Sequence, residues 1–99
     1  MIFDCGEMAI LERAVDTYGV QSQIRKAVEE MAELVKELCK DAGSGERVDL
    51  IAEEMADVEI MLEQLRYIYR RENIDFYVSR WKDAKVDRLR LRLEREGTR

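Results

Sequence analysis

The chain has no histidine and no proline among its 99 residues, and it has only two cysteines and five glycines. Without histidine, the Ser–His–Asp and Cys–His routes to nucleophilic catalysis are excluded. Two thiols alone do not make the usual zinc site. Any chemistry must therefore rest on carboxylates, lysine or arginine. The lack of proline and the scarcity of glycine favour long helices over a sheet.

The two cysteines, Cys5 and Cys39, are too few for a disulfide scaffold. A single bridge between them is the alternative, but we expect buried free thiols in a reducing cytoplasm. The first four residues lack the basic segment and apolar run of a signal peptide. No stretch reaches the roughly 18 apolar residues of a membrane span. We therefore expect a cytoplasmic protein that does not enter a membrane.

The formal net charge of −5 is the sum of two unlike halves. Residues 1–65 carry 16 acidic and 6 basic side chains, a net charge of −10. Residues 66–99 carry 11 basic and 6 acidic side chains, a net charge of +5. An acidic chain argues against general binding of nucleic acid, whereas the basic segment is suited to contact phosphates.

Apolar residues recur at helical spacing along most of the chain, which predicts four helices. We expect them at residues 6–18, 21–41, 47–71 and 75–95, with a glycine-containing loop at 41–46. Residues 88–93 alternate arginine and leucine with a period of two, as a half-buried strand would. A single strand would have no partner, so the helical interpretation is kept.

The expected fold class is all-α, an antiparallel bundle of three to four helices that forms a single domain over residues 1–99. Its parts are an N-terminal helix (1–19), an acidic helical hairpin (20–72) and a basic C-terminal helix (73–99). A lone bundle of this size buries a modest core. We therefore expect a homodimer or homotetramer.

The sequence contains a short acidic repeat. Glu29-Glu30-Met31-Ala32-Glu33 is followed 24 residues later by Glu53-Glu54-Met55-Ala56-Asp57. Folding the two helices about the loop places both segments at similar heights, since a helix rises about 1.5 Å per residue. By helical angle, Glu54 points close to the middle of the apolar stripe of its helix. An ionised carboxylate that faces a core costs several kcal/mol unless it is paired or holds a metal.

These carboxylates predict a metal site rather than a solvated face with salt bridges, an alternative that we favour only for Glu29 and Glu53. Oxygen ligands without histidine or cysteine suit Mg²⁺, Mn²⁺ or Ca²⁺. No run resembles a calcium-binding EF-hand loop. Mg²⁺ is the usual partner of a substrate polyphosphate. The expected ligands are Glu30, Glu33, Glu54 and Asp57.

The motif EExxE in one helix and ExxD in the next, separated by a short loop, resembles the MazG family of all-α nucleoside triphosphate pyrophosphohydrolases. Relatives of that family include the helical dUTPases and dCTPases, and the resemblance covers residues 20–88. It implies that the four expected ligands bind Mg²⁺ (or Mn²⁺), and that Glu29 and Glu30 serve catalysis, Glu29 by positioning water. It also implies cleavage between the α and β phosphates, which yields a nucleoside monophosphate and pyrophosphate.

Members of the resembled family also use basic residues after the second acidic helix to bind the phosphates of the substrate. The best matches in this chain are Lys82, Lys85 and Arg88. The alternative is a solvated basic face that pairs with Asp83 and Asp87.

Four further side chains are candidates for binding the base. Trp81 and Tyr77 are four residues apart and could stack on a nucleobase, although packing within the bundle or an interface is the favoured interpretation. Gln23, with Gln21, precedes the acidic motif by about two turns and could hydrogen-bond a base.

Two other functions compete with hydrolysis. The first is a non-catalytic helical oligomerisation or interaction protein, in which acidic and basic surfaces pair between subunits. The second is a nucleic-acid-binding helix at residues 80–95, whose binding would depend steeply on salt. The acidic remainder of the chain would repel the same polymer, so binding of nucleic acid is not expected.

Overall fold

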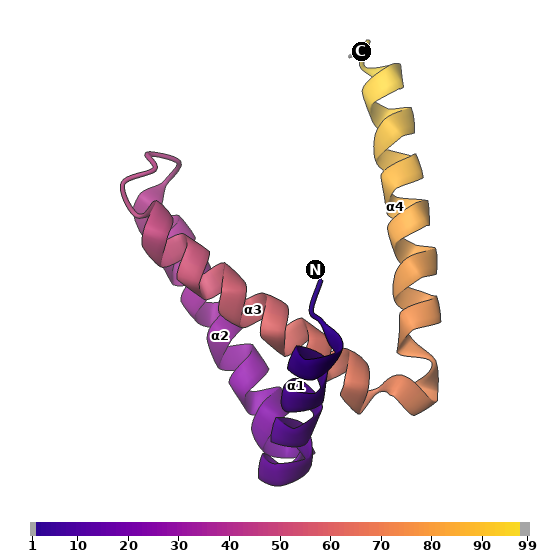
Figure 1. Cartoon of the computed structure of the whole chain (residues 1–99). Coiled ribbons are helices and arrows are strands. Elements are labelled where there is room, and N and C mark those ends of the chain that lie inside the picture. Colours follow the sequence, from indigo (N-terminus) through magenta and orange to yellow (C-terminus); the bar gives the residue numbers. More distant parts are fainter. Residues whose placement is uncertain (1, 98–99) are drawn as a thin grey trace. The chain divides into compact units, whose positions relative to one another are not determined.

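The computed structural model describes residues 2–97, and those residues are helical without a strand. The helices are α1 (Cys5–Tyr18), α2 (Val20–Asp41), α3 (Val48–Ile68), a single 3₁₀ turn η1 (Arg70–Glu72) and α4 (Ile74–Arg95) (Figure 1). The predicted all-α fold class is confirmed, as is the helical interpretation of residues 88–93. No helix among the described residues is both long enough and apolar enough to cross a membrane.

The predicted helix 47–71 ends earlier than expected. α3 stops at Ile68, and the chain continues through η1 to Asn73, which adopts a left-handed conformation with φ of 61°. Asparagine tolerates this conformation better than most residues. The break separates two compact units, Met1–Ile68 and Tyr69–Arg99. The single MazG-like domain over residues 1–99 stays a prediction.

In the first unit, α2 and α3 form an antiparallel hairpin, and α1 packs against both helices (Figure 1). The buried hydrophobic residues among those described are Val15, Ala27 and Met61, one from each helix. Two buried amides tie the same helices together. Gln23 Nε2 donates to Gln64 Oε1 at 2.8 Å, and Gln64 Nε2 donates to the Leu11 carbonyl oxygen at 3.1 Å. A small apolar core is thus accompanied by a pair of hydrogen-bonded amides, which fix the position of α1 on the hairpin.

The first helix begins with a capping box. Asp4 Oδ1 accepts a hydrogen bond from the Glu7 backbone N–H at 2.8 Å, and the Asp4 N–H donates to Glu7 Oε1 at 2.9 Å. Such a box satisfies two backbone donors that a helix start would otherwise leave unpaired. α1 ends at Gly19, whose φ of 95° favours glycine and lets α2 begin at the next residue.

The loop between α2 and α3 is organised by Asp41, whose side chain is buried at the end of α2. Its carboxylate accepts hydrogen bonds from the backbone N–H of Gly45 at 3.0 Å and of Arg47 at 2.8 Å. These two backbone donors hold the pKa of Asp41 below its usual value. Arg47 then pairs with Glu37 on α2, with Nη2 2.7 Å from Oε2. These contacts fix the conformation of the loop and therefore set the register of α3 against α2.

Replacing Asp41 by alanine is expected to lower the free energy of unfolding by about 1–2 kcal/mol at pH 7, because the backbone N–H groups of Gly45 and Arg47 lose a charged acceptor. The folded pKa of Asp41 lies below the unfolded value of 3.8. Its ionised form therefore stabilises the fold above that value, and the stabilisation is lost as the pH falls through the folded pKa. Urea unfolding at pH 7 and at pH 3 should show the gap between wild type and variant shrinking. A gap that stays constant would contradict this role.

Both cysteines are free, as expected, but the expectation that they are buried is wrong. Cys5 is the first residue of α1 and Cys39 lies near the end of α2, and both side chains are exposed. The number of apolar residues in the chain indicated a larger hydrophobic core than the first unit has.

The second unit consists of η1, α4 and their flanking residues. None of the described residues of α4 is buried. Cations lie over aromatic rings along its first half: the Arg80 guanidinium is 5.3 Å from the centroid of the Tyr77 ring, and Lys85 Nζ is 5.7 Å from that of Trp81. Further along, Arg90 pairs with Asp87 at 2.7 Å. α4 is therefore a basic helix with exposed aromatic side chains.

Candidate metal centre

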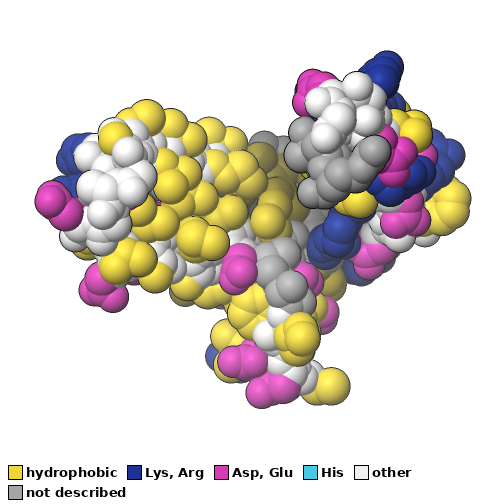
Figure 2. Space-filling model, turned by 90° about the horizontal axis from the view of Figure 1, so that it is seen from above, with side chains coloured by type: hydrophobic (Ala, Val, Ile, Leu, Met, Phe, Trp, Pro, Cys, Tyr) yellow, Lys and Arg dark blue, Asp and Glu magenta, His cyan; other side chains and the backbone are white. Residues whose placement is uncertain are grey.

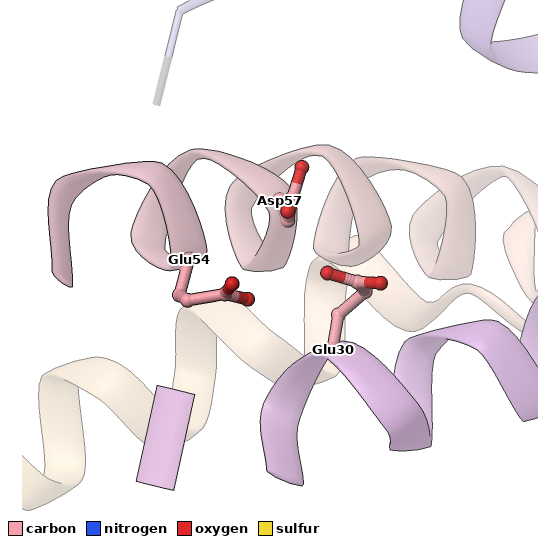
Figure 3. Close-up of side chains that lie close together, drawn as sticks. All are labelled: Glu30, Glu54 and Asp57. Atoms are coloured by element: carbon pink, nitrogen blue, oxygen red, sulfur yellow. The ribbon is translucent and has the colours of Figure 1, made fainter. Parts of the chain in front are cut away.

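Three carboxylates from the two acidic segments meet between α2 and α3. Glu30 projects from α2 and Glu54 from α3, and the carboxylate of Asp57, also on α3, lies close to both (Figure 3). One oxygen of each lies within 4.8 Å of an oxygen of each of the others, and all three residues are half-buried. We refer to these three residues as the acidic cluster. Its oxygens are close enough together to bind one small cation.

The register of the hairpin produces this cluster. Gln23 pairs with Gln64 below it, and Glu37 pairs with Arg47 above it. These contacts fix the two helices so that Glu30 lies level with Asp57, a consequence of folding the acidic repeat about the loop. Glu54 joins them because residues three apart on a helix are neighbours on its surface. The acidic segments thus meet because of helix geometry and the length of the loop.

Burial and mutual repulsion raise the pKa of two members of the cluster. For Glu30, desolvation is the largest cause, followed by hydrogen bonding to Asp57 and by the charge of Asp57. Lys26, one turn earlier, acts in the opposite direction, with Nζ 3.7 Å from Glu30 Oε1. For Glu54, desolvation again raises the pKa most, followed by the negative charges of Asp57 and Glu33. One lysine therefore leaves much of the negative charge of the cluster uncompensated.

One oxygen of the cluster has no hydrogen-bond partner. Glu54 Oε2 is buried, and no described residue donates to it. A buried acceptor without a donor costs about 1–3 kcal/mol, and more if it is charged. Native proteins rarely retain such an atom without a reason. A cation held between the three carboxylates would satisfy this oxygen and offset the repulsion that raises the two pKa values.

The other predicted acidic residues are exposed. Glu33 is not part of the cluster, because it is turned about 60° further around α2 than Glu30. Its charge still contributes to the raised pKa of Glu54, so it lies nearby. Glu29 and Glu53 are exposed, as the solvated-face interpretation expects. The structure therefore brings together three of the four predicted ligands and places the fourth beside them.

Two residues near the cluster were not singled out from the sequence. Glu37 is buried and is held by Arg47, whose Nε and Nη2 lie 2.8 and 2.7 Å from Glu37 Oε2. Glu37 lies seven residues after Glu30, and this spacing, which places both residues on the same helix face, could have identified it from the sequence. Lys26 lies one turn before Glu30, a spacing at which opposite charges commonly pair.

The predicted phosphate-binding residues, Lys82, Lys85 and Arg88, all lie on α4 in the second unit and are exposed. The predicted pairing of this basic face with Asp87 is made by Arg90 instead, at 2.7 Å. Trp81 is 50% exposed.

The candidate base-binding residue of the first unit has a different environment. The Gln23 side chain is buried between the helices, and its amide donates to Gln64. Gln21, two residues earlier, is exposed. The structure thus gives the Gln23 side chain a buried hydrogen bond within the first unit.

Comparisons of the chain with protein-family models, with curated protein sequences and with solved structures yield no match. Three carboxylate oxygens without nitrogen or sulfur ligands suit a hard divalent cation such as Mg²⁺ or Mn²⁺, which keeps several water ligands and is bound by a few carboxylates.

Proposed function

We propose that this chain binds Mg²⁺ at the acidic cluster and hydrolyses nucleoside triphosphates to a nucleoside monophosphate and pyrophosphate. The observation that carries the proposal is the buried Glu54 oxygen without a partner, in a cluster of three carboxylates that repel one another. The order of the motifs, with EExxE before a short loop and ExxD after it, supports the choice of reaction through the resemblance stated above.

In this proposal, Glu30, Glu54 and Asp57 hold the cation, and Glu33 extends the ligand set from its exposed position beside them. A bound Mg²⁺ supplies positive charge to the phosphate oxygens and makes nearby water more acidic. Glu29, exposed and next to Glu30, positions the water that attacks the α-phosphorus, and a carboxylate of the site accepts the proton of that water. One water is consumed, and the bond between the α-phosphorus and the bridging oxygen breaks.

The pyrophosphate that leaves carries several negative charges. Lys82, Lys85 and Arg88 are proposed to offset this charge, and Trp81 is proposed to stack on the base. Their exposure and chemistry support these roles. The proposal further includes a homodimer or homotetramer and a cytoplasmic location.

Hydrolysis is tested by incubating the purified chain with a panel of common and modified nucleoside triphosphates and Mg²⁺, and measuring pyrophosphate and monophosphate. We expect the two products in equal amounts from at least one nucleotide, with no release in EDTA. Release of inorganic phosphate instead would show cleavage at a different bond. If no nucleotide is cleaved and the stability of the chain does not respond to Mg²⁺, the non-catalytic interaction protein is the better account.

A further inference from the structure

One face of α4 carries basic and aromatic side chains without an acidic one. At about 100° per residue, six of these side chains fall within about 80° of one another around the helix. In chain order they are Tyr77, Trp81, Lys85, Arg88, Arg92 and Arg95. We refer to these six residues as the basic stripe. They follow one another at spacings of three or four residues, so the stripe runs along about 27 Å of the helix.

The acidic side chains of α4 lie on the other side of the helix. Each of them is turned by about 120° or more from Trp81, the central residue of the stripe. They are Asp75, Asp83, Asp87 and Glu94. Arg90, which is outside the stripe, pairs with two of them, at 2.7 Å from Asp87 and 3.0 Å from Glu94. The stripe is therefore more positive than the net charge of the helix indicates.

The cations of the stripe have no carboxylate partner among the described residues, and all of them are exposed. These cations are Lys85, Arg88, Arg92 and Arg95. Lys85 lies over the ring of Trp81, with Nζ 5.7 Å from the centroid. Successive cations are about 5 Å apart along the helix axis. A row of cations without counter-charges favours a ligand that carries several negative charges in a row.

Two kinds of polyanion suit such a row, an anionic membrane surface and a nucleic acid. A helix that lies on a membrane places its aromatic and aliphatic side chains on one face and its cations on the other. In α4, Trp81 is in line with the cations, whereas Leu89 and Leu93 lie about 80° and 120° away from it. Leu91 lies about 80° away in the opposite direction. Aromatic rings in line with cations are instead typical of proteins that bind single-stranded nucleic acid.

We infer that the basic stripe binds single-stranded nucleic acid. Its four cations contact successive phosphates, and bases stack on the rings at the N-terminal end of the stripe, Tyr77 and Trp81. These two side chains are 45% and 50% exposed. Every base offers an aromatic face, so binding requires no particular base sequence. It does require unpaired bases, because the bases of a duplex are stacked on one another.

The net charge of the whole chain does not decide whether the stripe binds a polyanion. The sequence alone argued against nucleic acid because residues 1–65 are strongly acidic. Those residues belong to the first unit, whereas α4 is part of the second, Tyr69–Arg99, whose sequence carries 10 basic and 6 acidic side chains. In Figure 2, Lys and Arg side chains gather on α4, which is seen there from its C-terminal end. Charges more than about 8 Å apart are largely screened at physiological ionic strength, so the charges along the stripe weigh most.

This binding goes beyond the proposed hydrolysis, although Trp81, Lys85 and Arg88 take part in both. A nucleoside triphosphate has one base and a short chain of phosphates, whereas the stripe continues past Arg88 with two further cations. These cations, Arg92 and Arg95, have no part in the proposed hydrolysis and are specific to the binding of a strand. Measurements in EDTA, with an oligonucleotide that carries no 5′-triphosphate, allow either proposal to fail without the other.

Trp81 makes the binding directly observable, because it is the one tryptophan of the chain. Titration of the full chain with oligothymidylate or oligouridylate of about 20 nucleotides should quench its fluorescence, since a base stacks on the indole. Quenching by either oligonucleotide supports the inference. Raising the NaCl concentration from about 50 to about 200 mM should raise Kd about 50-fold, the change expected when a single strand makes four phosphate contacts.

Matched variants of α4 separate the stripe from the overall charge of the helix. At about 50 mM NaCl, Arg92→Gln should raise Kd about 8-fold, because one phosphate contact is lost. Arg90→Gln removes the same charge from the opposite side of the helix and should change Kd less than ~2-fold. Trp81→Ala, measured by the fluorescence anisotropy of a labelled oligonucleotide, should raise Kd about 10-fold, and Trp81→Phe should restore most of the affinity.

The inference is overturned if neither oligonucleotide quenches Trp81 or binds the wild-type chain. Equal weakening by Arg90→Gln and Arg92→Gln would also overturn it, because the attraction would then be general. A duplex of the same length should bind more weakly and leave the fluorescence unchanged, and equally tight binding of the duplex would exclude stacking. If vesicles of phosphatidylserine and phosphatidylcholine shift the Trp81 emission to the blue while no oligonucleotide binds, the ligand is a membrane surface and the inference is wrong.

Discussion

Replacing Glu54 by glutamine is expected to reduce pyrophosphate release by at least ~100-fold, because the change removes a ligand charge from the centre of the acidic cluster. The side chain keeps its size, so the helices need not move. The rate is measured at saturating Mg²⁺ with a nucleotide that the wild type cleaves. Glu53→Gln, at the exposed neighbouring residue of the same helix, is the matched control and should keep most of the activity.

The same Glu54→Gln variant should be more stable than the wild type when metal is removed. Its free energy of unfolding in EDTA should rise by roughly 1 kcal/mol, because a buried charge with no partner is replaced by a neutral amide that can donate to nearby carboxylates. Urea unfolding of wild type, Glu54→Gln and Glu53→Gln measures the difference. A Glu54→Gln chain that is destabilised or fails to fold would show that Glu54 stabilises the fold through a direct partner, and would contradict the metal centre.

Mg²⁺ is expected to stabilise the wild-type chain. At a free concentration about 100 times the dissociation constant, a ligand that binds only the folded state adds about 2.7 kcal/mol. For a chain of 99 residues this corresponds to a rise in Tm of roughly 10 °C or more. Thermal unfolding followed by circular dichroism, in EDTA and in a series of Mg²⁺ concentrations, measures the shift.

Two controls distinguish binding at the acidic cluster from general screening of an acidic protein. NaCl at matched ionic strength should give a much smaller shift, because screening does not supply ligand bonds. Asp57→Asn should lose most of the response to Mg²⁺. Equal shifts with NaCl and with Mg²⁺, or an undiminished response in Asp57→Asn, would contradict a specific site. A non-catalytic interaction protein would show no specific response to Mg²⁺.

The helices and the hairpin could be predicted from the sequence because their signals are local. The apolar spacing along residues 21–41 and the glycines at 43 and 45 predicted α2 and its end. The end of α3 at Ile68 was missed by three residues, because the apolar pattern runs on into Tyr69 while the left-handed turn is made by Asn73. Burial of the cysteines was predicted wrongly, since periodicity does not reveal which apolar face a small helical unit leaves uncovered.

The acidic cluster could be predicted only in part. The repeat of the motif predicted that Glu30, Glu54 and Asp57 would approach one another, because helix rise and loop length fix their heights. The buried Gln23–Gln64 pair could not be foreseen, since glutamine is usually a surface residue and the contact spans 41 positions in the chain. Whether Glu33 faces α3 depends on how far each helix is turned about its own axis. The packing of the two helices decides this.

Direct measurement of cation binding at the acidic cluster is the most decisive test of this account. Free Mn²⁺ in water gives a sharp electron paramagnetic resonance signal that is lost on binding to a protein, so titration of the chain with Mn²⁺ counts the sites. We predict saturable binding to the wild type that Mg²⁺ displaces, with at least ~10-fold weaker binding to Glu54→Gln and unchanged binding to Glu53→Gln. A free Mn²⁺ signal that the wild-type chain does not reduce, or equal binding by Glu54→Gln, would contradict the metal centre.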